Sequence, residues 1–316
     1  MKFASIAEEL YVGKKEPIIP FRLLYLIWTN ARHLAGYEQQ DAHEFLINAL
    51  DVLHRHCKKK SDYGFLEDES TCQDVHHCDC IIDQVFTGGL QSDVVCQKCS
   101  GVSTTVDPFW DISLHIGSNL SNESLSSQKF SAFESPLGSS DGSNQSTLDS
   151  QGREEDDDRP PSSLSECLTR FTRAEQLGSA AKIKCSTCAT YEESTKRLSF
   201  KKLPLVACFH FKRFEHSTKA RKKIASYISF PYELDLSPFM SCAGNSYNPS
   251  KNTYVLFAVV NHLGTIDSGH YTAFVRLQKD RWFRCDDAVI TPALLQDCLN
   301  SEGYLLFYHK KYLEFH

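Results

Sequence analysis

The sequence predicts an α+β protein, because helical and strand patterns occupy different parts of the chain. Residues 18–57 carry apolar side chains at the spacing of amphipathic helices, whereas short β segments dominate from residue 200 to the end. Hydrophobic residues make up 41% and aromatic residues 11% of the 316 residues, as is ordinary for a folded protein. We therefore expect one large globular unit with ample apolar surface to bury.

Two helices are expected first, over residues 18–34 and 38–57. The first begins near Pro20, and its apolar side is formed by Leu23, Leu24, Ile27 and Trp28. The second has the most regular helical period in the sequence, with an apolar stripe of Phe45, Leu46, Ala49, Leu50 and Leu53. Residues 58–72 are polar and predict a loop, and short β segments are expected from Ile81 onward.

A serine-rich stretch, residues 117–165, interrupts the β pattern. Fifteen of its 49 residues are serine, and it contains the acidic run Glu154–Asp158. Such a composition buries too little apolar surface to offset the entropy lost on ordering. We expect a disordered insertion between strands, not a boundary between domains.

Four strands are expected in the last third of the chain, over residues 203–214, 254–260, 271–277 and 304–308. A further short strand, 282–285, reads as the hairpin partner of 271–277. This hairpin would bring His270 and Asp286 to the same end. A histidine can act there as a general base while a carboxylate fixes its tautomer. The alternative is an exposed histidine near an aspartate with no joint role.

The residues around His270 resemble the histidine box of the ubiquitin-specific proteases. The stretches that carry this resemblance are Asn261–Gly264, Ser268–Ala273, Trp282–Ala288 and Gly303–Tyr308. Gly36–Leu46 resembles the glutamine box of the same family, and Leu205–Phe214 resembles the strand before the histidine box. Residues 28–37, 86–93 and 105–111 are similar to the branch that acts on histone H2B in the SAGA co-activator complex. The resemblance runs from about residue 5 to the C-terminus, apart from the serine-rich stretch.

The resemblance implies a papain-like fold with a palm, zinc-bearing fingers and a truncated thumb. The catalytic domain would cover residues 1–316 but lack its N-terminal part. The family places its nucleophilic cysteine before the glutamine box, whereas the first cysteine here is Cys57. The zinc-finger domain of this branch would be missing as well. The implied activity is that of a cysteine-type deubiquitinase, acting in the nucleus (or the cytosol) with SAGA-type adaptors on ubiquitin attached to histone lysines. We expect the printed chain alone to be inactive. The alternative is a non-catalytic zinc scaffold that binds ubiquitin or adaptors.

The resemblance also gives individual residues their expected roles. His270 would deprotonate the cysteine and then protonate the leaving lysine amine, while Asp286 orients the imidazole and Asp287 assists or replaces it. Residues expected to contact the ubiquitin tail are Asp41, Glu44, Gly269 and Tyr271. The two acidic residues would pair with tail arginines, and the glycine and tyrosine would flank the tail channel. The alternative for the acidic pair is a solvated helix face.

Cysteine spacing is a separate signal for metal. Cys96-x-x-Cys99 and Cys185-x-x-Cys188 together offer the four thiolates of a closed structural zinc site, and the family's fingers often carry one. The alternative is two unrelated thiol pairs. A second, weaker zinc site is expected from His54, Cys57, Cys78 and Cys80, with His56 and His77 as spare ligands. The alternative there is a solvated histidine-rich helix end.

Three of the other cysteines are expected to be packed thiols. Cys167 follows the capping box Ser163-x-x-Glu166 and lies on the apolar side of a predicted helix, Cys208 alternates along a strand, and Cys285 adjoins Asp286.

Composition narrows the partners and the location. The net charge of −6 argues against nonspecific binding to nucleic acid, which needs a basic face. No apolar run approaches the ~20 residues of a membrane-spanning helix, and the first residues lack a signal peptide's apolar core. An odd number of cysteines without a secretory signal predicts a reducing compartment.

Overall fold

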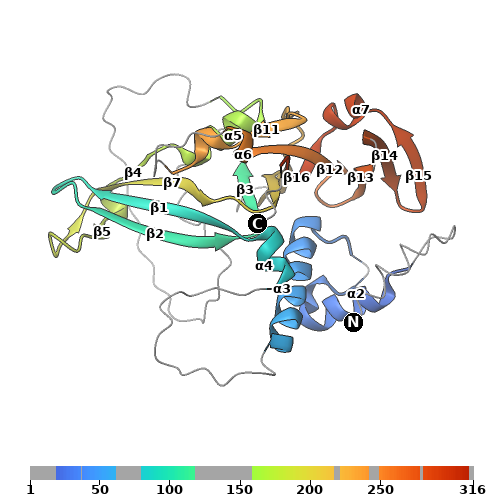
Figure 1. Cartoon of the computed structure of the whole chain (residues 1–316), viewed down its shortest axis with the longest axis horizontal. Helices are drawn as coiled ribbons and strands as arrows, with labels where there is room; N and C mark the ends of the chain where they lie inside the picture. Colours follow the sequence, from blue (N-terminus) through green and yellow to red (C-terminus); the bar gives the residue numbers. More distant parts are fainter. Residues whose placement is uncertain are drawn as a thin grey trace.

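The computed structural model describes residues 19–36, 38–61, 80–117, 159–216, 221–241, 249–277 and 280–312. Figure 1 shows three parts: a large sheet, a long four-stranded arm, and a group of helices near the N-terminus. The two longest described helices precede all the strands, and nearly all the strand pairs are antiparallel, which confirms the α+β prediction. These parts correspond to the predicted palm, fingers and thumb.

The large sheet is antiparallel except between its last two strands, β8 and β3. Its strands, in spatial order, are β15 (Val289–Ala293), β14 (Arg281–Asp286), β13 (Gly269–Leu277), β12 (Thr253–Gly264), β16 (Gly303–Lys310), β8 (Val206–Lys212) and β3 (Ile112–His115), with β11 (Glu233–Asp235) beside β12. Leu114, Phe211, Leu256, Leu306 and Tyr308 are buried in one continuous core on this sheet. The predicted C-terminal strands are therefore confirmed.

One predicted strand, 203–214, is shorter in the structure and divided. Pro204 has no N–H to donate to a sheet, and β8 begins after it, at Val206. The strand ends before Arg213, and the chain continues as β9 (Phe214–His216), which pairs with β10 (Arg221–Lys223). Arg213 is fully buried and donates from Nε to the Gly303 carbonyl at 2.8 Å. The guanidinium thereby fixes the end of β8 against β16.

The four-stranded arm joins chain segments from both sides of the serine-rich stretch. Its strands, in spatial order, are β2 (Val102–Phe109), β1 (Gly88–Cys96), β7 (Ser194–Lys202) and β4 (Glu175–Leu177). A small hairpin, β5 (Ile183–Lys184) with β6 (Tyr191–Glu192), lies at the far end of the arm (Figure 1). Because β1 precedes the stretch and pairs with β7, which follows it, the two sides of the stretch belong to the same arm. The disorder expected for residues 118–158 falls outside the described residues.

The region after residue 80 corrects one prediction. Residues 81–86 form a helix, α4 (Ile81–Phe86), before the first strand begins at Gly88. The Cys80 thiol accepts a hydrogen bond from the Asp83 N–H and caps this helix, a local contact that overrides the β preference of the isoleucines.

Helix α5 (Leu164–Thr172) starts inside the stretch predicted to be disordered, so the ordered chain resumes earlier than expected. Ser163 Oγ accepts from the Glu166 N–H, while the Glu166 carboxylate accepts from the Ser162 N–H at 2.6 Å. The predicted capping box is present, with its return bond shifted by one residue. Cys167 is 2% exposed, and burial raises the pKa of its thiol to about 12, which confirms a packed thiol.

The helical part contains α2 (Phe21–Asn30), the short turn η1 (Arg32–Leu34) and α3 (Ala42–Ser61). Ile27, Ala31 and Leu34 form a small core of their own, with Phe45 and Ala49 of α3 against it. Helix α3 starts four residues later than predicted, because Asp41 Oδ1 accepts from the His43 N–H at 2.7 Å and caps it. It ends at Ser61, so residues 58–61 are helical where a loop was expected; three of them are lysines, which favour helices.

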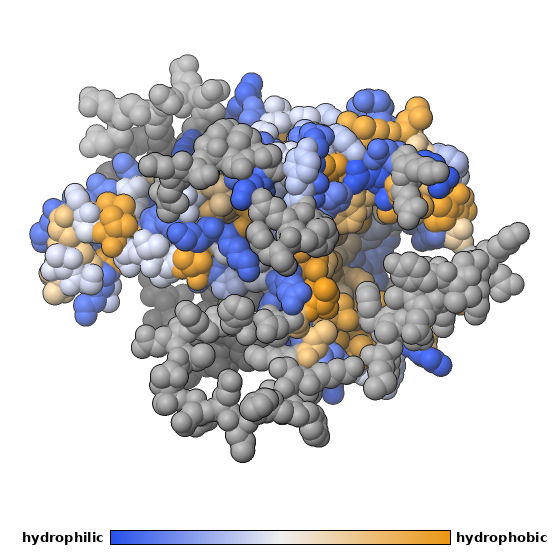
Figure 2. All heavy atoms as spheres, viewed as in Figure 1, coloured by the Kyte–Doolittle hydropathy of each residue, from blue (hydrophilic) through white to orange (hydrophobic). Residues whose placement is uncertain are grey.

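The remaining short elements are η3 (Ser179–Ala181), η4 (Ser237–Phe239), α6 (Pro249–Asn252) and α7 (Leu295–Leu299). Across the described residues, none of the helices combines the length and the apolar character needed to span a membrane. On the β15 side, Val289, Ile290 and Leu294 are exposed, and Figure 2 shows hydrophobic surface there.

Candidate active site and metal centre

His270 and Asp286 meet at the open end of the β13–β14 hairpin. Ala273 of β13 pairs with Cys285 of β14, so the first residues of β13 lie beside the last residue of β14. His270 Nε2 and Asp286 Oδ1 are 2.7 Å apart. The hairpin predicted from the sequence therefore places the two side chains together, with the imidazole 45% exposed to solvent.

The electrostatics of this pair favour a charged carboxylate and a basic imidazole. The hydrogen bond with Asp286 raises the pKa of His270, and the same bond lowers the pKa of Asp286. Arg284 donates from Nη2 to the other carboxylate oxygen, Asp286 Oδ2, at 3.0 Å. Both oxygens of Asp286 are thus engaged, one by the imidazole and one by the guanidinium of Arg284, which was not predicted.

Asp287 stands beside this pair without bonding to the imidazole in the described contacts. It adopts a left-handed backbone conformation, φ 50°, in the turn between β14 and β15. One carboxylate oxygen of Asp287, one of Asp286 and one ring nitrogen of His270 all lie within 4.8 Å of one another. The geometry selects Asp286 as the direct partner and leaves Asp287 as a nearby charge.

The unequal roles of the two aspartates can be tested by titration. We expect Asp286→Asn to lower the pKa of His270 toward the ordinary value of about 6.5, because the neutral amide no longer stabilises the imidazolium. The protonated fraction should fall at pH values just above that value. Asp287→Asn should lower it less, since it removes only a through-space charge. Proton NMR of the His270 ring measures both, and identical curves for the wild-type chain and Asp286→Asn would contradict this assignment.

The glutamine box lies against the start of β13. The Gln39 side chain donates to the Gly269 carbonyl and accepts from the Gly269 N–H at 2.7 Å. The Ala42 N–H donates to the Tyr271 hydroxyl at 3.3 Å. The structure therefore gathers Gly269 and Tyr271 with the first residues of α3, although these segments are about 230 positions apart.

Asp41 has a structural role that the sequence analysis did not foresee. Besides capping α3, its Oδ1 accepts from the buried Tyr304 hydroxyl at 2.6 Å. Glu44, one turn further along α3, is exposed and pairs with His33 Nε2 at 2.8 Å. A contact of either carboxylate with a ubiquitin tail stays a prediction. For Asp41 this contact would use Oδ2, because Oδ1 accepts from the His43 N–H and the Tyr304 hydroxyl.

Gly269 has no room for a side chain. A Cβ at this position would lie 2.1 Å from His262 Nε2 and 2.6 Å from the Leu263 carbonyl oxygen. His262 is 3% exposed, so it cannot move aside. This close approach explains why a glycine precedes the histidine.

The described cysteines do not supply a thiolate to His270. Burial raises the pKa of Cys208 and Cys285, and it raises the pKa of Cys298 to about 12. Cys285 adjoins Asp286 in the sequence, but successive side chains of a strand point to opposite faces. Cys208 is buried and Cys285 half-buried, as expected of packed thiols, and the buried Cys298 adds a third that was not predicted.

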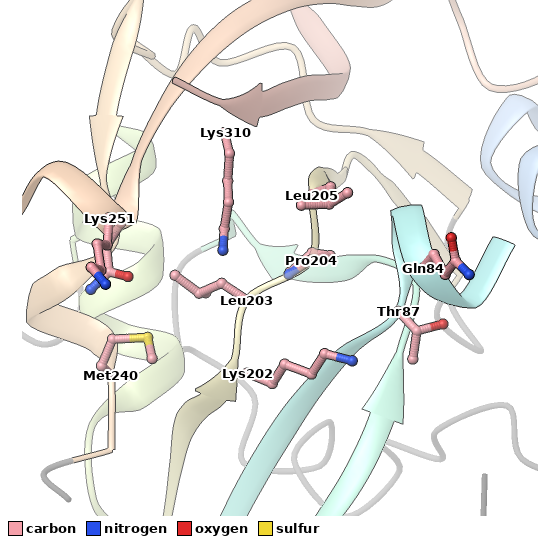
Figure 3. A pocket seen from close by; sticks show the side chains of 10 residues that line it. Gln84, Thr87, Lys202, Leu203, Pro204, Leu205, Met240, Lys251 and Lys310 are labelled. Carbon is pink, nitrogen blue, oxygen red and sulfur yellow. The ribbon is translucent and has the colours of Figure 1, made fainter. Parts of the chain in front are cut away.

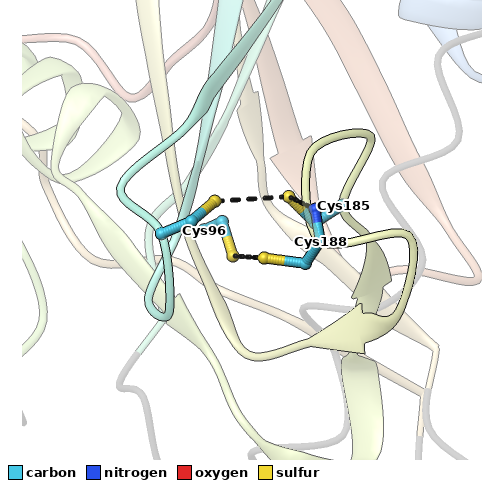
Figure 4. Close-up of side chains that lie close together, drawn as sticks. Cys96, Cys185 and Cys188 are labelled. Atoms are coloured by element: carbon cyan, nitrogen blue, oxygen red, sulfur yellow. Dashed lines mark hydrogen bonds between the residues drawn. The ribbon is translucent and has the colours of Figure 1, made fainter.

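Four cysteines at the tip of the arm, Cys96, Cys99, Cys185 and Cys188, converge from two similar turns. Figure 4 shows Cys96, Cys185 and Cys188. The Ser100 N–H donates to the Cys96 carbonyl and the Ala189 N–H to the Cys185 carbonyl, both at 2.9 Å. Ser100 and Ala189 also share the same left-handed backbone, φ 57°. Two equivalent turns therefore present two thiols each toward one point.

The distances between these thiols fit a tetrahedral metal. Cys96 and Cys188 Sγ are 4.0 Å apart, and Cys99 and Cys185 Sγ are 3.6 Å apart. Four sulfurs at the usual Zn–S distance of about 2.3 Å lie about 3.8 Å from one another. The Cys188 N–H donates to Cys185 Sγ and lowers the pKa of that thiol to about 6, whereas hydrogen bonding with Cys99 raises the pKa of Cys188 to about 12. The ionised thiolate of one cysteine therefore opposes ionisation of the neighbouring thiol unless a cation lies between the two sulfurs.

The second predicted metal group is only partly assembled by the described residues. His54 Nδ1 is 3.4 Å from Cys80 Sγ and 3.5 Å from Asp83 Oδ1, and the three ligand atoms lie within 4.8 Å of one another. Cys57 is outside this group, and His56 bonds instead to the Val52 carbonyl. Asp83 was not predicted as a ligand, because the candidates were chosen from histidine and cysteine spacing alone. Cys78 and His77 lie outside the described residues.

A pocket of about 400 Å³ lies away from these groups, at the base of the arm (Figure 3). Lys202, Leu203 and Lys310 are among its lining residues. Lys310 pairs with Tyr254 at the start of β12, whereas His270 pairs with Leu263 near its end. None of the predicted site residues lines this pocket.

The mixed sheet, the arm and the helical part, together with a histidine–carboxylate pair at the hairpin end, define the class of papain-like hydrolase scaffolds. A family model described as ubiquitin carboxyl-terminal hydrolase matches residues 1–308. The chain belongs to this family.

Individual relatives are similar over nearly the whole chain. Ubiquitin carboxyl-terminal hydrolase 22-A of Xenopus laevis is 55% identical over 325 residues, which cover 99% of this chain and 58% of that protein. Ubiquitin carboxyl-terminal hydrolase 27 of Homo sapiens is 55% identical, over 99% of this chain and 68% of that protein. The SAGA Ubp8/Sgf11/Sus1/Sgf73 DUB module bound to ubiquitin aldehyde aligns with a TM-score of 0.67 and 28% identity, over 93% of this chain and 55% of that chain. The chain thus spans little more than half the length of several of its relatives.

Proposed function

We propose that this chain carries the general base, the orienting carboxylate and the ubiquitin-tail channel of a thiol-dependent deubiquitinase. The observation that supports this most directly is the 2.7 Å contact between His270 Nε2 and Asp286 Oδ1, next to the glutamine box. With Nε2 committed to Asp286, Nδ1 is the nitrogen that remains to take a proton. The imidazole is exposed enough to receive a substrate.

In this proposal the base works in two steps. His270 Nδ1 accepts the proton of a cysteine thiol as the sulfur attacks the carbonyl carbon of the last glycine of ubiquitin, which the isopeptide bond joins to a lysine nitrogen. It then returns the proton to the lysine amine as the C–N bond breaks, while Asp286 stabilises the imidazolium between the steps. Ubiquitin is left on the sulfur as a thioester, which water hydrolyses to a free carboxylate and a free thiol. The family places that cysteine before the glutamine box, and the first cysteine of the printed sequence is Cys57. In this proposal the 316 residues supply the base and the carboxylate, and the nucleophile is not assigned to any of their cysteines.

The proposed partners follow from the relatives. The neighbouring structures are described as SAGA modules bound to ubiquitin aldehyde or to monoubiquitin, with Sgf11, Sus1 and Sgf73. We infer a ubiquitin tail passing Asp41, Glu44, Gly269 and Tyr271, adaptors of the SAGA type, and a nuclear location. A histone lysine as the attachment point is part of the same proposal. Structural zinc at Cys96, Cys99, Cys185 and Cys188 is supported by the spacing of their thiols.

A second candidate is a non-catalytic scaffold that binds ubiquitin. The observation that favours it is the state of the thiols, since burial raises the pKa of Cys167, Cys208, Cys285 and Cys298. This candidate shares the ubiquitin channel and lacks turnover in any form of the protein.

Labelling tests what the printed chain can do. We expect ubiquitin with a C-terminal thiol-reactive group to leave the chain unlabelled, because a neutral, buried thiol is a poor nucleophile. The exposed Cys99 and the ionised Cys185 belong to the proposed zinc site, where the metal would occupy their sulfurs. Unmodified ubiquitin should nevertheless bind, as measured by calorimetry. Intact-mass spectrometry reads the labelling, and the solved relatives' full module serves as the positive control. Rapid labelling at one cysteine would overturn the assignment of these thiols, and an absence of ubiquitin binding would overturn the proposed channel.

A further inference from the structure

We propose that Gln39 is a positioning residue for His270, and that it acts by clamping the peptide backbone immediately before the histidine. The inference rests on the proposed function, because it concerns the same base. The amide of Gln39 donates to the Gly269 carbonyl and accepts from the Gly269 N–H. One side chain therefore satisfies both backbone groups of a single residue.

The place of Gly269 in the sheet shows why a clamp is needed. Strand β14 pairs with β13 only as far as Cys285, opposite Ala273, and it ends at Asp286. On that side the first residues of β13 have no neighbouring strand in the described pairing. The N–H and C=O of a strand residue point the same way, and those of Gly269 point to Gln39. The Gln39 amide thus takes the place of the missing strand.

The same segment also holds the residue on the other side of the histidine. The Ala42 N–H donates to the Tyr271 hydroxyl at 3.3 Å, and burial raises the pKa of Tyr271 to about 12, so this hydroxyl stays neutral. His270 is therefore placed between two residues, each anchored to residues 39–42. An exposed imidazole on a strand end needs such support if it is to keep its contact with Asp286.

Packing does not explain the position of Gln39. Its side chain is exposed, and a glutamine loses rotamer freedom when it is held by two hydrogen bonds. The turn before Gly269 is exposed as well, and it is closed by the Thr265 N–H donating to the Ser268 carbonyl. Without the clamp, this turn and the β12 pairing would be the remaining restraints on the backbone before His270.

Hydrogen exchange and titration on the printed chain test the proposal without any turnover. Gln39→Ala should lower the protection of the Gly269 amide about tenfold, the value of one or two net hydrogen bonds. It should also lower the pKa of His270, because a looser strand weakens the bond to Asp286. Gln40→Ala is the matched control, since the neighbouring glutamine makes no hydrogen bond to Gly269 in the described part of the chain. Protection of core amides such as Leu256 monitors global stability in each variant.

Gln39→Glu gives a sharper test. An ionised glutamate can accept from the Gly269 N–H but repels the Gly269 carbonyl, so protection should fall near neutral pH. A protonated carboxyl both donates and accepts, as the amide does. After correction for intrinsic exchange, protection at Gly269 should therefore recover as the pH falls through the glutamate pKa, and the wild-type chain should show no such step.

The outcomes separate this proposal from the proposed function. If Gln39→Ala leaves both Gly269 protection and the His270 pKa at the Gln40→Ala values, the clamp is refuted. Equal loss of protection at Gly269 and Leu256 would also refute it, because the effect would then be global unfolding. If ubiquitin fails to bind while the clamp signals are present, the proposed function falls and the positioning of His270 stands.

Discussion

Cys96→Ser is expected to abolish metal binding at the tip of the arm and to unfold it locally. Structural zinc contributes on the order of 10 kcal/mol of apparent binding free energy, which is coupled to folding. Cys96 is buried at the end of β1, and β1 lies between β2 and β7, so the loss should reach the strands that meet there. The zinc-to-protein ratio should fall by one, and the thermal unfolding midpoint should drop.

Cys285→Ser is the control for this experiment. Cys285 is half-buried in β14 and belongs to none of the candidate metal groups among the described residues. It should keep the zinc content of the wild-type chain. The metal site would be refuted if the folded wild-type chain, purified without a chelator, contained no zinc. An unchanged zinc content in Cys96→Ser would refute Cys96 as a ligand.

Under the proposed function, His270→Ala is expected to abolish turnover in a protein that carries the family's nucleophilic cysteine. The test protein is a chimaera that joins the part of human ubiquitin carboxyl-terminal hydrolase 27 outside the matched region to this chain. General acid–base catalysis is typically worth ~10²–10⁴-fold, and this histidine would serve as base and acid in turn. Hydrolysis of a ubiquitin–fluorophore conjugate measures the rate.

The aspartates provide the comparison. Asp286→Ala should slow the chimaera strongly, because it removes the bond that fixes the imidazole, and Asp287→Ala should slow it less, because Asp287 makes no such bond in the described contacts. Near-full activity of His270→Ala would refute the proposed base. If Asp287→Ala were the more damaging substitution, the choice between the two carboxylates would be wrong.

Local signals explain the parts of the fold that the sequence predicted well. The apolar period of α3, the alternation of the C-terminal strands and the Ser163-x-x-Glu166 cap each depend on residues within a few positions of one another. The predictions that were wrong lie where one contact outweighs these patterns. Examples are the late start of α3 at the Asp41 cap and the helix α4, which is capped by Cys80.

For the site, the sequence by itself determined the residue types and the family, including His270, the two following aspartates and the paired cysteine turns. Only the tertiary structure decided which groups meet. In the structure Asp286, and not Asp287, bonds to His270, and Arg284 bonds to Asp286. Asp41 caps α3 and accepts from Tyr304, and Asp83 lies beside His54. Gln39 bonds to the backbone of Gly269. The physical reason is distance along the chain. Hydrogen bonds between residues up to 263 positions apart depend on how the sheet and the helices pack, and no local pattern of side chains encodes them.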